Sequence, residues 1–312
     1  MRVLLVHNPG AGAGPSTAGD ELLDLARAQG HLAEHLSTGE DGWTDRMRDA
    51  EVDVVAIAGG DGTLRKAMTA LAGTDVTVGV IATGTANNIA NTLGTPIDDP
   101  AAAIAAWDGA RELRYDVPLL RSCRAGGEVG SSRLVESVGG GTFAELLAVA
   151  EDQEERLGQD GDLQDGLRLL RGVLRDADPE PWRVVLDGED LSGSFVAVEA
   201  MNIRRVGPNV ELAPGARPGD GSIDLVLVDA HGRDALVRHV DDLAARGTDR
   251  APAPLGLRVR RGAELRLVPP SGSHLHVDDQ HWRADVAADG TSGDELELVV
   301  DGTTLRVLVP PR

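Results

Sequence analysis

The sequence predicts a Rossmann-like, parallel α/β domain at the N-terminus, followed by a mostly antiparallel, sandwich-like β domain with helical inserts. Up to about residue 117, short apolar segments alternate with helix-like segments, which is typical of a parallel sheet. Beyond that point, short segments of alternating polarity end in glycine-containing turns, which is typical of antiparallel β structure. We therefore expect two domains, residues 1–117 and 118–312.

Four apolar segments of the first domain are expected to be strands, at residues 2–7, 31–38, 52–58 and 76–82. Helices are expected after them, at about 16–29, 44–51, 63–72 and up to Leu93. Right-handed crossovers place the loops that follow parallel strands on one edge of the sheet. The loops NPGAGAG, GGDGT and TGTANN should therefore converge with Thr38 where α/β folds bind ligands.

The second domain is expected to consist mainly of strands. The segments that predict them include WRVVLDG, SGSFVAVEAMN, SIDLVLVD, ELRLVPP and TTLRVLVP. Two helical inserts are expected at about 142–157 and 163–175, and a third helix at 232–246.

Composition limits the function classes. The formal net charge is −21, which argues against nucleic acid as a partner and against a polybasic attachment to anionic lipid. One cysteine excludes an intramolecular disulfide. The N-terminal apolar segment is too short for a signal peptide, and no segment approaches the length of a membrane span. We therefore expect a cytoplasmic protein.

The three glycine-containing loops predict an anion site. GGDGT alone could be a tight turn between a strand and a helix, capped by Asp61 or Thr63. Three such loops at one sheet edge exceed what turns require, and their N–H groups suit a phosphate. None matches the P-loop pattern or the dinucleotide pattern GxGxxG.

With these motifs in this order, the sequence resembles the catalytic domain of the diacylglycerol kinase, sphingosine kinase and bacterial lipid kinase family. NPGAG, GGDGT and GTANN carry the resemblance in the first half, and the segment from EAMN to PGARPGDGSID carries it in the second. NAD kinases share GGDGT, but TGTANNIANTLG is more similar to the lipid kinase pattern. The resemblance implies transfer of the γ-phosphate of ATP to a lipid hydroxyl, with diacylglycerol as the first candidate.

The resemblance also implies site residues. A nucleotide site would be formed by Asn8, Pro9, Gly10, Ala11, Gly12, Thr38, Gly60, Asp61, Gly62, Thr63, Leu64, Arg65, Lys66, Thr85 and Asn88. Asp61 and Asp116 match acidic positions that work with Mg²⁺, and a turn residue at a strand end is the alternative for Asp116. Phosphoryl transfer needs such a cation to neutralise the phosphate charge.

A second metal site is implied in the segment PGARPGDGSID. Bacterial relatives hold a structural Mg²⁺ there, and the matching ligands are the Asp220 carboxylate and the carbonyls of Arg217 and Ser222. Oxygen ligands in a glycine-containing turn suit this ion. A plain Asp-Gly turn before the next strand is the alternative.

Two positions depart from the family pattern. Asn88 stands where an aspartate is usual, and Gln280 stands where the resemblance implies a general base. An amide cannot accept the proton of a hydroxyl, and a missing general base typically costs about 10²–10⁴ in rate. Asp278 could replace it if residues 278 and 280 share one strand face. His274, His276 and Asp278 could instead hold zinc or iron, or simply form a polar strand face.

We therefore expect an ATP- and Mg²⁺-dependent lipid kinase whose catalytic residues include Gln280, Asp278, Asp61 and Asp116. A nucleotide-binding protein with little activity, and a kinase of a soluble alcohol or NAD, remain alternatives. Phe143, Leu146, Leu147 and Val149 could line a lipid entrance or belong to an ordinary core helix. Transient membrane contact and a homodimer also remain open.

Overall fold

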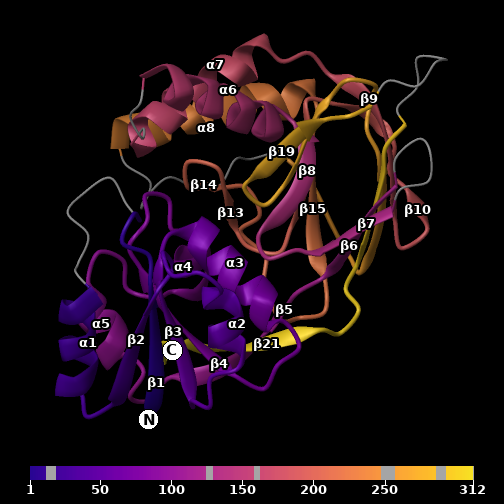
Figure 1. Cartoon of the computed structure of the whole chain (residues 1–312). Helices are drawn as coiled ribbons and strands as arrows, with labels where there is room; N and C mark the ends of the chain where they lie inside the picture. Colours follow the sequence, from indigo (N-terminus) through magenta and orange to yellow (C-terminus); the bar gives the residue numbers. More distant parts are fainter. Residues whose placement is uncertain (12–18, 124–128, 158–161, 247–256, 286–292, 312) are drawn as a thin grey trace. The chain divides into compact units, whose positions relative to one another are not determined.

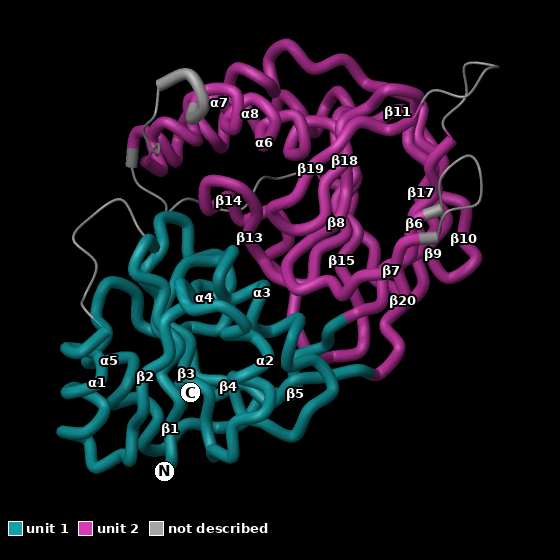
Figure 2. Tube along the Cα trace, in the orientation of Figure 1, with its two compact units in different colours: residues 1–117, 303–312 teal, residues 118–302 magenta. Residues whose placement is uncertain are grey.

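The chain divides into two compact units, which Figure 2 colours separately. Residues 1–117 and 303–312 form the first, and residues 118–302 form the second. The expected second domain included residues 303–312, but Thr304–Val309 (β21) pairs with strands of the first sheet. The computed structural model describes residues 1–11, 19–123, 129–157, 162–246, 257–285 and 293–311.

The first unit is built on a six-stranded sheet in the order β2-β1-β3-β4-β21-β5 (Figure 1). Besides β21, its strands are Arg2–His7 (β1), Leu32–Ser37 (β2), Val54–Gly59 (β3), Thr77–Ala82 (β4) and Arg111–Asp116 (β5). All neighbours pair in parallel except β5, which runs antiparallel to β21. The predicted parallel α/β fold is confirmed, with an antiparallel edge that the alternation did not predict.

Helices cover this sheet, so its central strands β3 and β4 are buried along their whole length. The helices are Gly19–Ala28 (α1), Trp43–Arg48 (α2), Asp61–Leu71 (α3), Asn88–Leu93 (α4) and Pro100–Ala105 (α5). Leu22 and Ala26 of α1 join Val3 and Leu5 in one core cluster. Leu64, Met68 and Leu71 follow the spacing of one helix face and bury α3.

The second unit contains two larger sheets and a β-ribbon. One sheet has the order β10-β9-β17-β20-β6-β7 with β11 on β9, and it comprises Leu119–Cys123 (β6), Val129–Arg133 (β7), Glu180–Leu186 (β9), Glu189–Asp190 (β10), Gly193–Phe195 (β11), Glu264–Val268 (β17) and Glu295–Val299 (β20). The other has the order β16-β15-β12-β8-β18-β19, and it comprises Ser137–Gly141 (β8), Ala197–Met201 (β12), Ile223–Val228 (β15), Arg258–Gly262 (β16), His274–Val277 (β18) and Gln280–Arg283 (β19). Arg205–Val206 (β13) and Val210–Glu211 (β14) form the ribbon.

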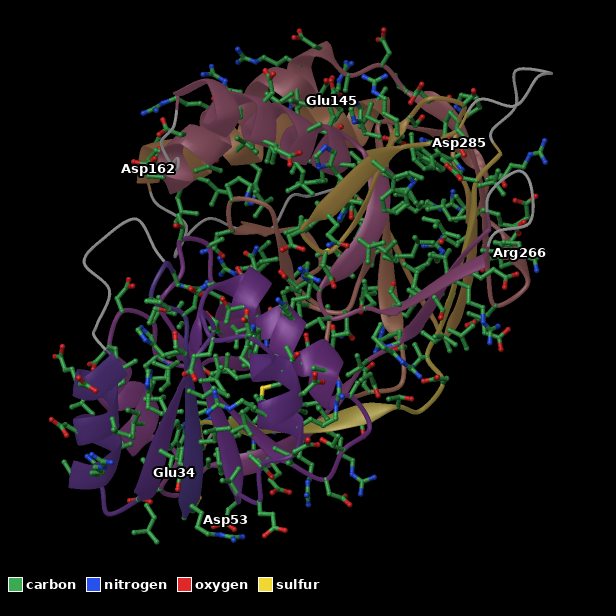
Figure 3. The ribbon with its side chains drawn as sticks, viewed as in Figure 1. Glu34, Asp53, Glu145, Asp162, Arg266 and Asp285 are labelled. Atoms are coloured by element: carbon green, nitrogen blue, oxygen red, sulfur yellow. The ribbon has the colours of Figure 1, made fainter. Side chains whose placement is uncertain are left out.

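Alternating side chains of these two sheets share one apolar core, as in a sandwich. Val184, Leu267 and Leu298 come from one sheet, and Val198 and Leu225 come from the other. The opposite face of the first of these sheets is polar. There Arg266 of β17, labelled in Figure 3, pairs with Glu295 (2.9 Å) and Glu297 (2.8 Å) of β20.

Three helices cover the other face of the sheet that contains β8. They are Thr142–Leu157 (α6), Leu163–Asp176 (α7) and Ala230–Arg246 (α8), close to the predicted helices. Asp162 begins α7 with a capping box, in which its side chain accepts the Asp165 N–H. Among the helices that the structure describes, none combines the length and apolarity that crossing a bilayer requires.

Candidate functional site

Three loops meet at one edge of the first sheet, directly after the parallel strands β1, β3 and β4. The ladder of backbone hydrogen bonds continues into them. The Asn8 N–H donates to the Ala58 carbonyl (2.9 Å), and the Thr83 N–H donates to the Gly59 carbonyl (3.1 Å). Strand pairing therefore holds the starts of these loops side by side.

The loops after β3 and β4 approach so closely that a Cβ at Gly84 would overlap the other loop and a Cβ at Gly60 would crowd it. A Cβ on Gly84 would lie 2.4 Å from the Cα of Gly60, and a Cβ on Gly60 would lie 3.1 Å from the Cα of Gly84. Asn87 holds this contact, because its side chain accepts the Gly84 N–H (2.9 Å) and donates to the Gly84 carbonyl (2.8 Å). These glycines are required for packing of backbone against backbone.

Asn8 ties the first loop to the start of α3. Its side-chain amide donates to Thr63 Oγ1 (2.8 Å), and its side-chain oxygen accepts the Gly10 N–H (3.0 Å). Helix α3 begins at Asp61, with Gly60 as its N-cap residue. The positive end of the α3 dipole therefore lies among the loops and favours an anion there.

A pocket of about 450 Å³, here called the strand-end pocket, lies at this edge. It is lined by Asn8, Ala11, Thr38, Trp43, Gly60, Gly62, Thr63, Lys66, Gly84 and Thr85. Of these residues only Lys66 carries a charge. One cation among hydroxyl and backbone groups, in a chain of net charge −21, suits an anionic ligand. Eight of the fifteen predicted nucleotide-site residues are thus brought together, namely Asn8, Ala11, Thr38, Gly60, Gly62, Thr63, Lys66 and Thr85.

Trp43 is a pocket residue that the sequence analysis missed. It begins α2 and is 6% exposed, and the Lys66 ammonium lies 5.3 Å from the centroid of its ring. This distance is typical of a cation–π contact, which restrains the position of the only lysine in the chain. The signal available in the sequence was a bulky aromatic residue five positions after Thr38, in a chain with few aromatics.

Other predicted nucleotide-site residues lie away from the pocket lining. Leu64 is fully buried on the core face of α3, so its side chain is not accessible to a ligand. Pro9 and Gly10 are exposed in the first loop, and Arg65 is partly buried on α3. Gly12 lies outside the described residues.

The two predicted acidic residues of the first unit do not line the pocket either. Asp61 Oδ2 accepts the Asn88 N–H (2.9 Å), and Asp61 Oδ1 accepts the Ile89 N–H (3.1 Å). Asp61 therefore caps the start of α4, where Asn88 is buried. Asp116 is 5% exposed at the end of β5. A role for either carboxylate with Mg²⁺ stays a prediction.

Asp278 lies in the turn between β18 and β19, with φ of 52°. Its Oδ1 accepts the N–H groups of Glu136 (2.7 Å) and Ser137 (3.2 Å), and its Oδ2 accepts that of Val135 (3.4 Å). The expectation that residues 278 and 280 share a strand face is wrong, because Asp278 is not in a strand. Gln280 is the exposed first residue of β19.

The buried pair of His276 and Glu199 contacts this turn through the Asp278 carbonyl. His276 and Glu199 are 1% and 0% exposed, and His276 Nε2 lies 2.8 Å from Glu199 Oε2. His276 Nδ1 lies 3.0 Å from the Asp278 carbonyl, and it carries the hydrogen because a carbonyl only accepts. Gly139 makes room for the pair, since a Cβ there would lie 2.7 Å from Glu199 Oε2.

The pair sets the charge of His276. Burial lowers the pKa of His276. The Glu199 carboxylate and the hydrogen bonds to Glu199 and Asp278 raise it, and together they outweigh burial, so the pKa stands above its usual value of 6.5. The suggested metal set of His274, His276 and Asp278 is not supported. Within the described residues, no three His, Cys, Asp or Glu side chains are grouped so that they could hold a metal.

The second predicted metal site also has other partners. Asp220 Oδ1 accepts the N–H (3.2 Å) and the hydroxyl (2.7 Å) of Ser222, and Asp220 Oδ2 is paired with Arg261. Arg217 is exposed in the same loop. The structure therefore brings Asp220 and Ser222 together, and the guanidinium of Arg261, which comes from β16, contacts both of them.

The apolar side chains of α6 separate into two groups. Phe143 and Leu146 are buried in the core between the helices and the sheet, which favours the core-helix interpretation for them. Leu147 and Val149 are partly buried. These two stay candidates for an acceptor entrance.

Comparisons with known proteins match nearly the whole chain. A family model described as the diacylglycerol kinase catalytic domain matches residues 2–118. A second, described as the YegS C-terminal NAD kinase beta sandwich-like domain, matches residues 144–290. These two matches follow each other along the chain in the order that the glycine motifs and the later strands predicted.

Individual relatives agree. The chain is 30% identical over 266 residues to a protein of Stenotrophomonas maltophilia named "Probable lipid kinase YegS-like", covering 79% of this chain and 81% of the relative. It is 28% identical over 223 residues to a diacylglycerol kinase of Mycobacterium tuberculosis, covering 70% and 67%. A diacylglycerol kinase structure from Bacillus anthracis superposes with a TM-score of 0.67 at 19% identity, covering 99% of this chain and 97% of that one, and supports the fold.

Proposed function

This chain belongs to the family of diacylglycerol kinases and YegS-like lipid kinases, and on that premise we propose that it transfers the γ-phosphate of ATP to a lipid hydroxyl. Diacylglycerol is the first candidate acceptor, because relatives at 27–28% identity carry the name diacylglycerol kinase.

The strand-end pocket carries this proposal. Its volume of about 450 Å³ is in the range of pockets that hold small ligands and cofactors. Its wall offers glycine backbone, hydroxyl groups and Lys66, and it lacks carboxylates among the lining residues. A triphosphate needs this combination, because N–H groups and one cation stabilise its charge while carboxylates would repel it.

The reaction is a displacement at phosphorus. The acceptor oxygen forms a bond to the γ-phosphorus, the bond to the bridging oxygen of ADP breaks, and the acceptor proton is released. The transition state is loose, so positioning and charge neutralisation supply most of the rate. The chain's contribution is to hold the phosphates on the glycine backbone and on Lys66.

Magnesium bound with ATP would neutralise charge on the transferred group. Asp61 is the carboxylate that would hold it, because it is the first residue of α3 and lies between the pocket residues Gly60 and Gly62.

Gln280 is the feature that favours the alternative of weak activity. It is exposed at the start of β19, where the family pattern implies a glutamate. An amide accepts no proton from the acceptor hydroxyl, so the Gln280 side chain cannot serve as the general base. We expect Gln280→Glu to raise turnover by about 10²-fold or more if the position serves as general base.

The test is transfer of radiolabelled phosphate from ATP in the presence of Mg²⁺. Diacylglycerol, monoacylglycerol and sphingosine in mixed micelles are compared with glycerol and NAD in solution, for the wild type and for Gln280→Glu. Labelled lipid that depends on micelles supports the proposal and identifies the acceptor.

Either of two results would replace the proposed lipid kinase activity with one of the alternatives. ADP binding without transfer to any acceptor, in both proteins, indicates a nucleotide-binding protein without kinase activity. Transfer to NAD or to a soluble alcohol in the absence of micelles indicates the soluble-acceptor alternative. Gly172→Ala, on an exposed position of α7, serves as the control for substitution as such.

A further inference from the structure

The edge strand β16 places an arginine beside the segment for which the family resemblance implies a metal. Strands β15 and β16 pair antiparallel, with Asp224 directly opposite Arg261. Side chains of directly opposed residues lie on the same face of a sheet. The backbone ladder therefore brings Arg261 to Asp224 and to the loop that precedes β15.

The Arg261 guanidinium closes a ring of polar contacts with that loop. Its Nη2 pairs with Asp220 Oδ2 and donates to Ser222 Oγ at 2.7 Å. The Ser222 hydroxyl in turn donates to Asp220 Oδ1 at 2.7 Å. The Nε of Arg261 lies 3.7 Å from Asp224 Oδ2. One cation thus serves two carboxylates and the hydroxyl between them.

The charges of this corner need a cation. The Asp224 side chain is only 4% exposed. Burial raises the pKa of Asp224, Arg261 lowers it, and the negative charge of Asp220 raises it again. Arg261 is therefore the group that favours the ionised form of Asp224. Without it, two carboxylates would face each other with little solvent to screen the inner one.

The carboxylate of the implied ligand set already has partners within the chain. Magnesium requires near-octahedral oxygen ligands at about 2.0–2.1 Å. Both oxygens of Asp220 accept hydrogen bonds or an ion pair from Ser222 and Arg261. A guanidinium stays charged at every pH at which the protein is folded, so a divalent ion there would meet a fixed positive charge.

We propose that the Arg261 guanidinium takes the place of the structural magnesium ion that the family resemblance implies at Asp220. The loop of residues 214–222 is then closed onto the sheet edge by a residue of the chain itself. If this is so, the free energy of unfolding of the second unit does not depend on Mg²⁺. This inference does not depend on the proposed kinase activity, because it concerns folding.

Thermal unfolding of the full chain without nucleotide tests it. We expect the wild type to have the same Tm in EDTA and in ~5 mM Mg²⁺. Arg261→Met keeps the apolar stem and removes the charge, so we expect its Tm in EDTA to fall by about 2–6 °C. Adding ~5 mM Mg²⁺ should restore most of that loss, because Asp220 and the neighbouring carbonyls become available to the ion.

Arg258→Met is the matched control, since Arg258 is an exposed residue of the same strand. We expect its Tm to stay within about 1 °C of the wild type, with and without Mg²⁺. The proposal is overturned if Mg²⁺ raises the wild-type Tm by several degrees and Asp220→Asn abolishes the rise. This comparison decides the matter even if Arg261→Met does not fold. If Mg²⁺ raises the Tm of Asp220→Asn as much as that of the wild type, the ion binds elsewhere, and the assignment of Arg261 to this site stands.

Discussion

The strand-end pocket of the first unit and the β18–β19 turn of the second are built from different materials. In the pocket, glycine backbone and hydroxyl groups form the wall, and Gly60 and Gly84 are there because two backbones touch. In the turn, Asp278 is held by three backbone N–H groups and stands on the His276–Glu199 pair. A wall of glycine backbone and hydroxyl groups is suited to binding a ligand. A polar side chain whose oxygens already have several partners in the chain is suited to stabilising the fold.

The largest effect should come from the buried pair. His276→Leu leaves the Glu199 carboxylate buried without its partner, so we expect a loss of about 3–5 kcal/mol in the free energy of unfolding. Urea unfolding followed by circular dichroism measures it. Nucleotide affinity, which the proposed function assigns to the first unit, should not change.

A double substitution separates charge from packing in this pair. Replacing Glu199 by Met in the His276→Leu background removes the unpaired charge, so most of the lost stability should return. A loss below about 1 kcal/mol for His276→Leu alone would contradict the supporting role assigned to the pair.

The same pair predicts a pH dependence that is part of this effect. Because the pKa of His276 is raised above 6.5 in the folded protein, its stabilisation is fully present below about 6.5 and is lost as the pH rises through the folded value. The pKa values of His7, His31, His239 and His274 are lowered, mainly by burial, and act in the opposite direction.

Comparison with His276→Gln isolates the contribution of His276 from that of the other histidines. We expect the difference in unfolding free energy between the two proteins to be largest near pH ~6 and to shrink at higher pH. A difference that grows with pH would mean that His276 is neutral in the folded protein.

Gly84→Ala tests the backbone side of the comparison. The new Cβ would overlap the Cα of Gly60, so the two loops must separate, at a cost of about 1–3 kcal/mol. We expect ADP affinity, measured by titration calorimetry, to fall about 10- to 100-fold. Gly172→Ala is the matched control, because an added Cβ there would meet no atom within 4 Å beyond its chain neighbours and the backbone of its own helix, so affinity should not change. Unchanged affinity in Gly84→Ala would mean that the nucleotide binds elsewhere.

This contrast also explains what the sequence could predict. The pocket follows from local patterns, since each loop comes directly after an apolar strand and crossover handedness brings the loops together. Trp43 was missed because its place beside Lys66 depends on how α2 lies against α3, which no short motif encodes. The backbone N–H groups that Asp278 accepts lie 141–143 positions away in the chain, and Arg261 lies 41 positions from Asp220, so only strand pairing reveals these contacts.

The smallest effect should come from the charged wall of the pocket. Lys66→Met removes a solvent-exposed cation that sits over Trp43, so we expect ADP affinity to fall about tenfold, with no loss of stability. Trp43→Leu keeps the lysine but removes the ring that restrains it, and should cost only about two- to fivefold. Arg114→Met, an exposed residue of β5, controls for the change in net charge. If the Lys66 effect is electrostatic, the gap between wild type and Lys66→Met must narrow as salt increases. A gap that salt does not alter would assign the loss to a changed pocket shape, and the distinction between a binding wall and a supporting turn would then need another basis than charge.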